Sequence, residues 1–256
     1  MSASRVAAAL TTIGRYAVAL LRYNLILPWY RPNEAKRFLT LALEYDFQRG
    51  AGRKLPSAPV LDIFPEARQQ EWTVAGQSAA DVETLVLCAA VRAVGARRVL
   101  EIGTFEGATT VQLAANVTAD GHVFTLDLDP AGAADAVIPC VGSDVQLTGK
   151  PLERIGRQYR DTPYAARITQ ILHDSTTVDY RQYFDQLDLA FIDGGHSYEQ
   201  VKCDTERVLP LVRPGGAVLW HDYRPGCAGV RRYLHELART RPVRHVRGTC
   251  LAALRV

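Results

Sequence analysis

From residue 98 onward, short apolar runs typical of buried strands alternate with segments whose apolar residues recur at helical spacing. A first helix is expected to begin near Ser78, a plausible N-cap, and to end at Gly95. The predicted strands are 98–102, 122–127, 166–172, 187–193, 217–220, 243–246 and 250–255, and the later predicted helices are 109–116, 152–159, 198–212 and 229–238. This alternation favours an α/β fold with a mostly parallel, Rossmann-like sheet, helices on both faces and an antiparallel hairpin at one edge.

The N-terminal residues differ from the rest in charge. Residues 1–33 contain no acidic residue, and their four basic residues are Arg5, Arg15, Arg22 and Arg31. The arginines interrupt every apolar window that could span a membrane or form the core of a signal peptide. The segment is either a basic helix on an anionic membrane surface or a helix that packs on the domain or across a dimer interface. We therefore predict a basic helical extension and connecting arm over 1–76 and one main domain over 77–256.

Composition restricts the class of protein further. The chain has 256 residues and a formal net charge of +3, which is too small to indicate a nucleic-acid partner. Its five cysteines are scattered and form no CxxC pair, so neither a disulfide scaffold nor a zinc knuckle is expected. A cytoplasmic protein is the default expectation, with peripheral contact at the inner membrane as the alternative for the N-terminal segment. The oligomeric state stays open, a homo-oligomer included.

The end of the first predicted strand carries a glycine-containing loop. Its spacing, E-x-G-x-x-x-G, differs from the G-x-G-x-x-G that binds a pyrophosphate. An acid at this position would repel a pyrophosphate and suits a ligand with an ammonium or sulfonium charge. A plain strand-to-helix turn is the alternative. The candidate cofactor residues in this loop are Glu101, Gly103, Thr104, Phe105 and Gly107.

Two further strand ends carry candidate ligand contacts. Asp127 ends the second strand, where a carboxylate can accept hydrogen bonds from a ribose diol. Asp129 is the alternative at this strand end, although it could instead cap the next turn. After the third strand, Asp174 and Ser175 either contact a purine edge or cap a turn.

The fourth and fifth strands end in acids and histidines. Four apolar residues lead to Asp193, and two glycines then precede His196. A lone buried carboxylate is costly, so Asp193 and His196 are expected to face a site at the carboxyl edge of the sheet. The fifth strand ends in His221 and Asp222, which would lie beside them. With an ordinary pKa near 6.5, His196 is a credible general base, and the alternative is a histidine that is hydrogen-bonded within a turn.

Together these motifs resemble the class I S-adenosylmethionine-dependent methyltransferases, over roughly residues 78–256. The first motif is similar to that of the catechol-type O-methyltransferase branch, although Phe105 stands where the commonest pattern has a third glycine. The stretches 192–199 and 211–222 resemble a bacterial subgroup associated with sugar and natural-product O-methylation. The resemblance implies seven strands with the last inserted antiparallel, S-adenosylmethionine as cofactor, and Asp127 as the ribose-binding acid.

The resemblance also implies the chemistry of the site. His196 occupies the place of the branch's catalytic lysine, and Asp193 lies beside it as an acceptor anchor or metal ligand. Asp193, His221 and Asp222 match positions that bind magnesium in related enzymes, so a divalent cation, Mg or Mn, is expected. A histidine shifts the preference toward manganese, iron or zinc, unless His221 lies outside the ligand set and orients Asp222.

The sequence therefore predicts an O-methyltransferase that acts on a hydroxylated small molecule such as a sugar, a glycolipid or a natural product. Two rival functions stay open. One is an NAD-dependent oxidoreductase on a similar sheet, against which Glu101 and the missing G-x-G-x-x-G count. The other is a catalytically inactive, membrane-recruited binding protein that keeps the fold.

Overall fold

The computed structural model describes residues 54–71, 73–75, 82–140, 144–145, 151–183 and 185–256. The basic segment 1–33 and the predicted helix start at Ser78 lie outside the described residues. Within the described ranges, no helix has the length and apolar character needed to cross a membrane.

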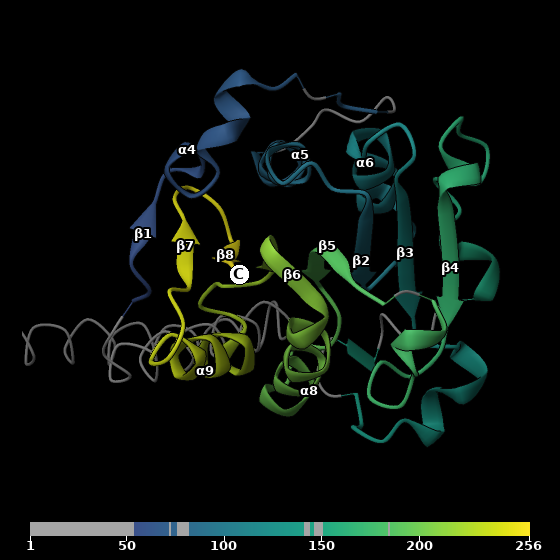
Figure 1. Cartoon of the computed structure of the whole chain (residues 1–256). Helices are drawn as coiled ribbons and strands as arrows, with labels where there is room; N and C mark the ends of the chain where they lie inside the picture. Colours follow the sequence, from purple (N-terminus) through teal and green to yellow (C-terminus); the bar gives the residue numbers. More distant parts are fainter. Residues whose placement is uncertain (1–53, 72, 76–81, 141–143, 146–150, 184) are drawn as a thin grey trace, which may run out of the picture. The chain divides into compact units, whose positions relative to one another are not determined.

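One mixed sheet forms the centre of the described domain (Figure 1). Its eight strands are β1 (Ser57–Ala58), β2 (Arg98–Ile102), β3 (His122–Asp127), β4 (Ile168–Leu172), β5 (Leu187–Ile192), β6 (Val212–Trp220), β7 (Arg244–Val246) and β8 (Ala252–Arg255). They lie in the order β1-β7-β8-β6-β5-β2-β3-β4. Only β8 runs antiparallel to its neighbours, β6 and β7. The predicted mostly parallel sheet with a closing antiparallel hairpin is confirmed.

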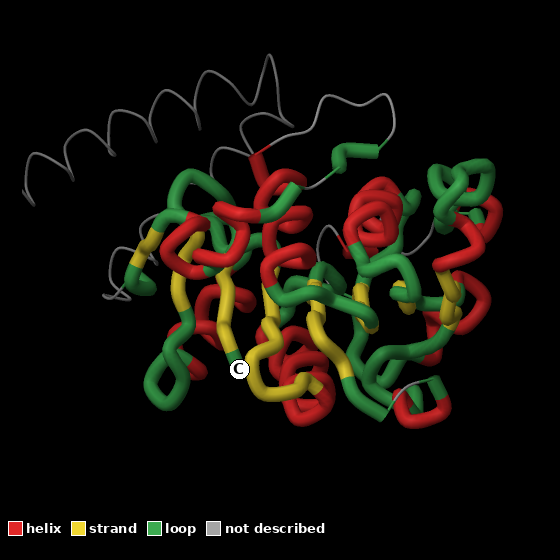
Figure 2. Tube along the Cα trace, turned by 45° about the horizontal axis from the view of Figure 1, so that its top comes forward, coloured by secondary structure: helices red, strands yellow, loops and turns green. Residues whose placement is uncertain are grey.

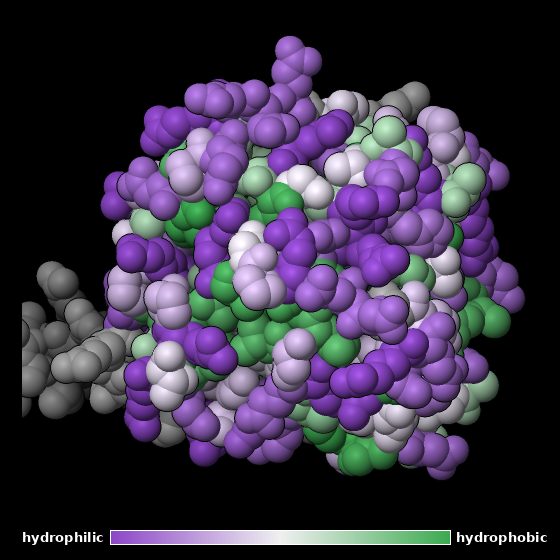
Figure 3. All heavy atoms as spheres, viewed as in Figure 1, coloured by the Kyte–Doolittle hydropathy of each residue, from purple (hydrophilic) through white to green (hydrophobic). Residues whose placement is uncertain are grey.

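Helices cover both faces of the sheet, as predicted (Figures 1 and 2). The α-helices are α4 (Val60–Ile63), α5 (Val82–Ala93), α6 (Ala108–Asn116), α8 (Tyr198–Val208) and α9 (Ala228–Leu237). The 3-10 turns are η1 (Pro65–Gln69), η2 (Pro130–Asp135), η3 (Leu152–Arg154), η4 (Ala165–Arg167), η5 (Tyr180–Gln182) and η6 (Leu209–Leu211). One apolar cluster joins α5 and α6 to the sheet, and another joins α8 and α9 to it. Apolar side chains are thereby buried in two layers, and Figure 3 shows a largely hydrophilic outer face with an apolar area near its middle.

Strand β1 is an addition to the seven strands that the resemblance implied. Ser57 and Ala58 pair with His245 and Val246 of β7, and Phe64 just after them is completely buried. The structure thus joins 54–71 and 73–75 to the folded unit, whereas the sequence placed all of 1–76 outside the main domain. A strand of two residues is too short to produce the alternating pattern by which strands are predicted.

Two predicted elements have different boundaries. The helix expected over 152–159 is only the turn η3, because Gly156 donates its N–H to Phe105 O at 2.9 Å and draws the chain onto the glycine-containing loop. The helix expected to reach residue 212 ends at Val208. The Arg-Pro-Gly-Gly stretch at 213–216 lies inside β6.

Candidate active site

The parallel strands bring their carboxyl ends to one edge of the sheet. Ile102, at the end of β2, pairs with both Leu126 of β3 and Ile192 of β5, and Ile192 pairs with Trp220 of β6. The residues that follow these strands therefore meet, although they are far apart in the sequence. Parallel α/β sheets bind their ligands at this edge.

Gly103 makes the close approach of β2 and β5 possible. Its φ is +101°, and a Cβ built on it would lie 2.1 Å from Asp193 O. Asp193 N donates to Ile102 O at 2.8 Å, so the two strand ends are held at this separation. Only glycine fits here. The positive φ is strained for any residue with a Cβ, and the Cβ would also collide with the carbonyl oxygen of Asp193.

A cavity of about 420 Å³ opens at this edge, a volume within the usual range for small-molecule sites. The predicted site residues that line it are Gly103, Phe105, Asp127, Asp174, Ser175, Asp193, His196, His221 and Asp222. Glu101, Thr104 and Gly107 do not line it. Three predicted cofactor residues therefore need a correction.

Glu101 is completely buried beneath the loop and does not reach the cavity. Its Oε2 accepts hydrogen bonds from Thr110 Oγ1 at 2.5 Å and from Thr125 Oγ1 at 2.6 Å. Burial raises its pKa to about 8. Glu101 thus joins β2, β3 and α6 as a largely neutral internal group, and the inference that its charge faces a cationic ligand was wrong.

Thr104 and Gly107 also have structural roles in the loop and do not line the cavity. The Thr104 hydroxyl lies 2.7 Å from Thr125 Oγ1 and accepts Gln170 Nε2 at 2.9 Å. Gly107 has φ +87° at the N-cap of α6, and a Cβ on it would come within 2.8 Å of the Tyr159 ring. Both residues shape the loop whose members Gly103 and Phe105 face the cavity.

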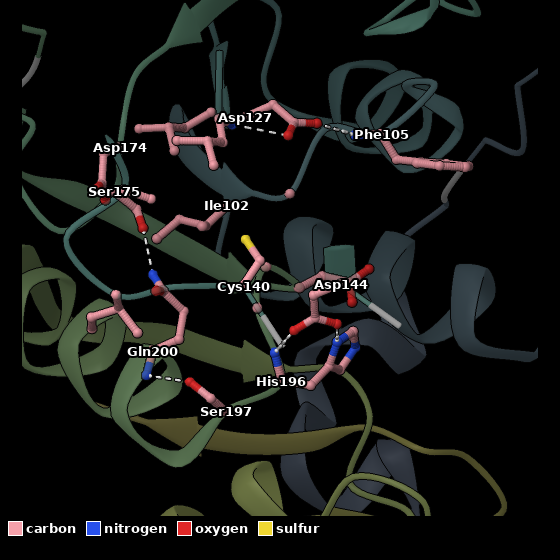
Figure 4. A pocket seen from close by; sticks show the side chains of 18 of the residues that line it. Ile102, Phe105, Asp127, Cys140, Asp144, Asp174, Ser175, His196, Ser197 and Gln200 are labelled. Atoms are coloured by element: carbon pink, nitrogen blue, oxygen red, sulfur yellow. Dashed lines mark hydrogen bonds and ion pairs between the residues drawn. The ribbon is translucent and has the colours of Figure 1, made fainter. Parts of the chain in front are cut away.

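Asp127 faces the cavity at the end of β3 (Figure 4). Its carboxylate accepts the N–H of Phe105 at 2.7 Å and the N–H of Leu128 at 2.9 Å. Phe105 has φ +49°, a conformation rare for a side-chain-bearing residue, and the hydrogen bond to Asp127 helps to hold it. Asp129, the alternative acid, instead caps η2 by accepting the Ala131 N–H at 2.9 Å.

Asp174 and Ser175 line the cavity beyond the end of β4 and also hold turns. Asp174 Oδ1 accepts the Thr176 N–H at 2.8 Å, and its Oδ2 accepts the Val137 N–H at 3.0 Å. Ser175 Oγ donates to Asp204 Oδ1 at 2.7 Å. Asp174 therefore holds a turn, as the alternative expected, and the contact of this pair with a purine edge stays a prediction.

His196 lies between two carboxylates. Asp144 Oδ2 accepts its backbone N–H at 2.8 Å, Asp144 Oδ1 lies 2.5 Å from ring Nδ1, and Asp222 Oδ2 contacts ring Nε2 (Figure 4 shows the contacts with Asp144). The hydrogen bonds to Asp144 and then Asp222 raise the pKa of His196 to about 10. Both ring nitrogens therefore face carboxylates, an arrangement that favours the protonated ring. Sequence reasoning missed Asp144, because residues 130–150 show no periodicity.

His221 forms a second bridge of the same kind. Its Nε2 lies 2.9 Å from Glu83 Oε2 on α5, and its Nδ1 lies 3.1 Å from Asp193 Oδ1. Burial opposes the charge, but Asp193, Asp222 and Glu83 raise the pKa of His221 to about 12. Burial itself raises the pKa of Asp193. Glu83 was also missed, since one acid near a helix start is unremarkable in sequence.

Three side chains here offer a suitable donor set for a divalent cation. Ligand atoms of Asp193, His221 and Asp222 all lie within 4.8 Å of one another. Asp222 Oδ1 meets Arg224 Nε at 2.5 Å as an ion pair but without hydrogen-bond geometry. Burial opposes ionisation of Asp222, yet His196 and His221 hold its pKa below the usual range. Two ionisable carboxylates and one imidazole fit Mg²⁺ or, better, Mn²⁺.

Comparisons with known proteins find a similar domain and a similar fold. Residues 100–223 match a family model described as a methyltransferase domain. The structure of the O-methyltransferase NovP has a TM-score of 0.57 with this chain at 15% identity, covering 85% of this chain and 98% of NovP. The O-methyltransferase TomG from Streptomyces achromogenes, in complex with S-adenosylmethionine, has a TM-score of 0.49 at 20% identity, with 84% and 96% covered.

A curated relative matches only part of the chain. The uncharacterized protein y4gI of Sinorhizobium fredii is 43% identical over 58 residues, which are 22% of this chain and 6% of that protein. This chain thus spans a small fraction of that relative's length. The matched model and the shared fold thus place a methyltransferase domain at residues 100–223 of this chain.

Proposed function

We propose that the protein transfers a methyl group from S-adenosylmethionine to a hydroxyl group of a small molecule. The observation that carries the proposal is the single cavity that joins Asp127 at the end of β3 to Asp193, His196 and Asp222 at the ends of β5 and β6. One end offers a ribose-binding carboxylate, and the other offers groups for proton transfer. The name of NovP, an O-methyltransferase, supports the same reaction.

The cofactor would lie across the end of β2. Asp127 would accept hydrogen bonds from the ribose hydroxyls, in a cavity where Gly103 and Phe105 form the neighbouring wall. The methyl group would then point toward Asp193 and His196. Alignment of acceptor oxygen, methyl carbon and sulfur can supply much of the rate acceleration in such a displacement.

His196 would act as the general base after a change of partner. In the structure Nε2 contacts Asp222, and Asp144 holds Nδ1. When Nε2 leaves Asp222, it first gives up its proton to water. The neutral ring can then take the proton of the acceptor hydroxyl as the oxygen attacks the methyl carbon and the C–S bond breaks, which releases S-adenosylhomocysteine. Asp144 would keep the ring oriented and stabilise the imidazolium that forms.

We propose that Asp193, His221 and Asp222 hold a magnesium or manganese ion. When bound, the ion would lower the pKa of the acceptor hydroxyl as a Lewis acid. The competing arrangement has His221 outside the ligand set, where its bridge from Glu83 to Asp193 orients the carboxylate.

Transfer of labelled methyl from S-adenosylmethionine to a panel of sugars, glycolipids and phenols tests the proposal. His196→Ala is expected to reduce the rate about 100-fold or more, since general-base catalysis contributes about that much. The matched control is His122→Ala, because His122 bonds Thr169 Oγ1 at 2.8 Å and does not line the cavity. Activity that survives EDTA, with no magnesium or manganese binding by calorimetry, rejects the metal. Binding of NADH without binding of S-adenosylhomocysteine rejects the methyltransferase proposal in favour of an oxidoreductase.

We also propose that residues 1–33 bind anionic membranes at their surface, which would leave the protein in the cytoplasm or at the inner membrane. Their arginines and apolar residues, without any acid, support this partner. Co-sedimentation with phosphatidylglycerol vesicles is expected for the full chain. It should be lost when Arg5, Arg15, Arg22 and Arg31 are replaced by glutamine. Equal recovery of both proteins in the pellet contradicts the proposal.

A further inference from the structure

We propose that Gln200 selects the adenine base of the methyl donor by accepting a hydrogen bond from its exocyclic amino group. Gln200 lies in the first turn of α8 and lines the cavity, and the sequence drew no attention to it. The inference rests on the proposed function, because it requires an adenosyl cofactor in this cavity.

The sheet order decides where the base lies. With the ribose at Asp127 on β3, the methyl end faces Asp193 on the β5 side of the sheet. The base must extend the other way, toward the end of β4, where Asp174 and Ser175 lie (Figure 4). Apolar groups for the purine faces are present in this part of the cavity, namely Leu128, Ile138 and Pro139.

The nearby side-chain oxygens already take part in hydrogen bonds within the protein. Asp174 Oδ1 accepts the backbone N–H and the hydroxyl of Thr176, and Asp174 Oδ2 accepts the N–H of Val137. The Ser175 hydroxyl donates its proton to Asp204 and accepts Gln200 Nε2 at 2.9 Å. The Gln200 amide oxygen has no hydrogen-bond partner among the described residues, which leaves it available to a ligand.

Two contacts decide which way the Gln200 amide points. Nε2 donates to Ser175 Oγ and, at 3.1 Å, to Oδ1 of the completely buried Asp204. The reversed amide would place its oxygen against the Asp204 oxygen, so Nε2 stays on this side and Oε1 on the other. Gly195 leaves the space for this arrangement, because a Cβ there would lie 2.8 Å from Gln200 Cγ.

This orientation distinguishes two purines. The 6-amino group of adenine donates hydrogen bonds, and Gln200 Oε1 can accept one. Hypoxanthine carries an oxygen at the same place, which would face Oε1 without a proton between them. An amide that could turn freely would tolerate both bases, but turning here would break the hydrogen bonds to Ser175 and Asp204.

Calorimetric titration of the full chain with S-adenosylhomocysteine and S-inosylhomocysteine tests the inference. We expect the wild type to bind the adenine compound about tenfold more tightly or better. This ratio corresponds to the hydrogen bond that adenine makes and to the unpaired acceptor that hypoxanthine leaves. Gln200→Leu should reduce the preference to about threefold or less. Ser175→Ala, which frees the amide of one anchor, should give a preference between these values.

Gln182→Leu is the matched control, because it makes the same change on the exposed turn η5, away from the cavity. It should keep the wild-type preference. Two results would overturn the role of Gln200 and leave the proposed function standing. One is a Gln200→Leu protein that keeps the wild-type preference, and the other is a wild type that binds both compounds equally. A wild type that binds neither compound overturns the proposed function and this inference with it.

Discussion

Asp144 holds His196 at two points, the backbone N–H at 2.8 Å and ring Nδ1 at 2.5 Å. Asp144 belongs to the connection between β3 and β4, whereas His196 follows β5, so this pair closes one wall of the cavity across the ends of the strands. The hydrogen bond to Asp144 is also the first cause of the upward shift in the pKa of His196, ahead of the bond to Asp222.

Asp144→Asn should therefore destabilise the protein more at pH 6 than at pH 10. The pKa of His196 is raised from 6.5 to about 10, so its contacts contribute stability that is fully present below pH 6.5 and is lost as the pH rises toward 10. Urea unfolding at the two pH values measures the difference. Asp161→Asn, on an exposed turn, is the control. An equal loss at both pH values contradicts the prediction.

Relative to wild type, the substitution Glu101→Gln should become more favourable for the stability of the protein as the pH rises. Burial raises the pKa of Glu101 from 4.5 to about 8, so its contribution to stability is fully present below pH 4.5 and is lost as the pH rises toward 8. Relative to wild type, the free energy of unfolding of the variant should increase between pH 5 and pH 8.5. Glu106, whose pKa Arg157 and Arg154 lower to about 2, stays ionised in this range. Glu106→Gln should accordingly change the free energy of unfolding by the same amount at both pH values. If the two variants respond to pH in the same way, the raised pKa of Glu101 is contradicted.

Gly103→Ala should destabilise the fold by more than about 2 kcal/mol, because a left-handed backbone angle and a close carbonyl both oppose a side chain. Its Cβ would lie 2.1 Å from Asp193 O. Gly132→Ala is the matched control, since a Cβ there meets nothing within 4 Å and its φ is ordinary. Denaturant unfolding of the two variants gives the comparison, and similar midpoints would refute the packing argument.

Asp127→Asn should remove discrimination between S-adenosylhomocysteine and its analogue without ribose hydroxyls. The wild type should prefer the natural compound about tenfold or more, since hydrogen bonds to a carboxylate are among the stronger ones. Calorimetry on both ligands separates this effect from a general loosening of the loop that Asp127 also holds. Asp129→Asn, at the cap of η2, should leave the preference unchanged. A variant Asp127→Asn with wild-type preference would remove the ribose assignment.

Much of the fold was predictable because its signals are local. The stretches that became β2, β3 and β5 are mostly apolar, and parallel strands buried on both faces produce this pattern. The acids that end them, Asp127 and Asp193, could be found for the same reason. Strand β1 could not be predicted, because two residues are too few to show a period. The turn η3 could not be predicted either, because a long-range hydrogen bond from Gly156 to Phe105 forms where a helix was expected.

The sequence by itself determined the alternation of strands and helices and placed Asp127, Asp193, His196 and Asp222 at strand ends. Only the tertiary structure decided what surrounds them. It moved Glu101 out of the cavity and into the core, and it supplied partners from distant segments, Asp144 for His196 and Glu83 for His221. The physical reason is that local periodicity follows from neighbouring residues, whereas burial and charge pairing depend on segments that meet only in the fold. A histidine expected to act as a base is therefore held between two carboxylates in this structure.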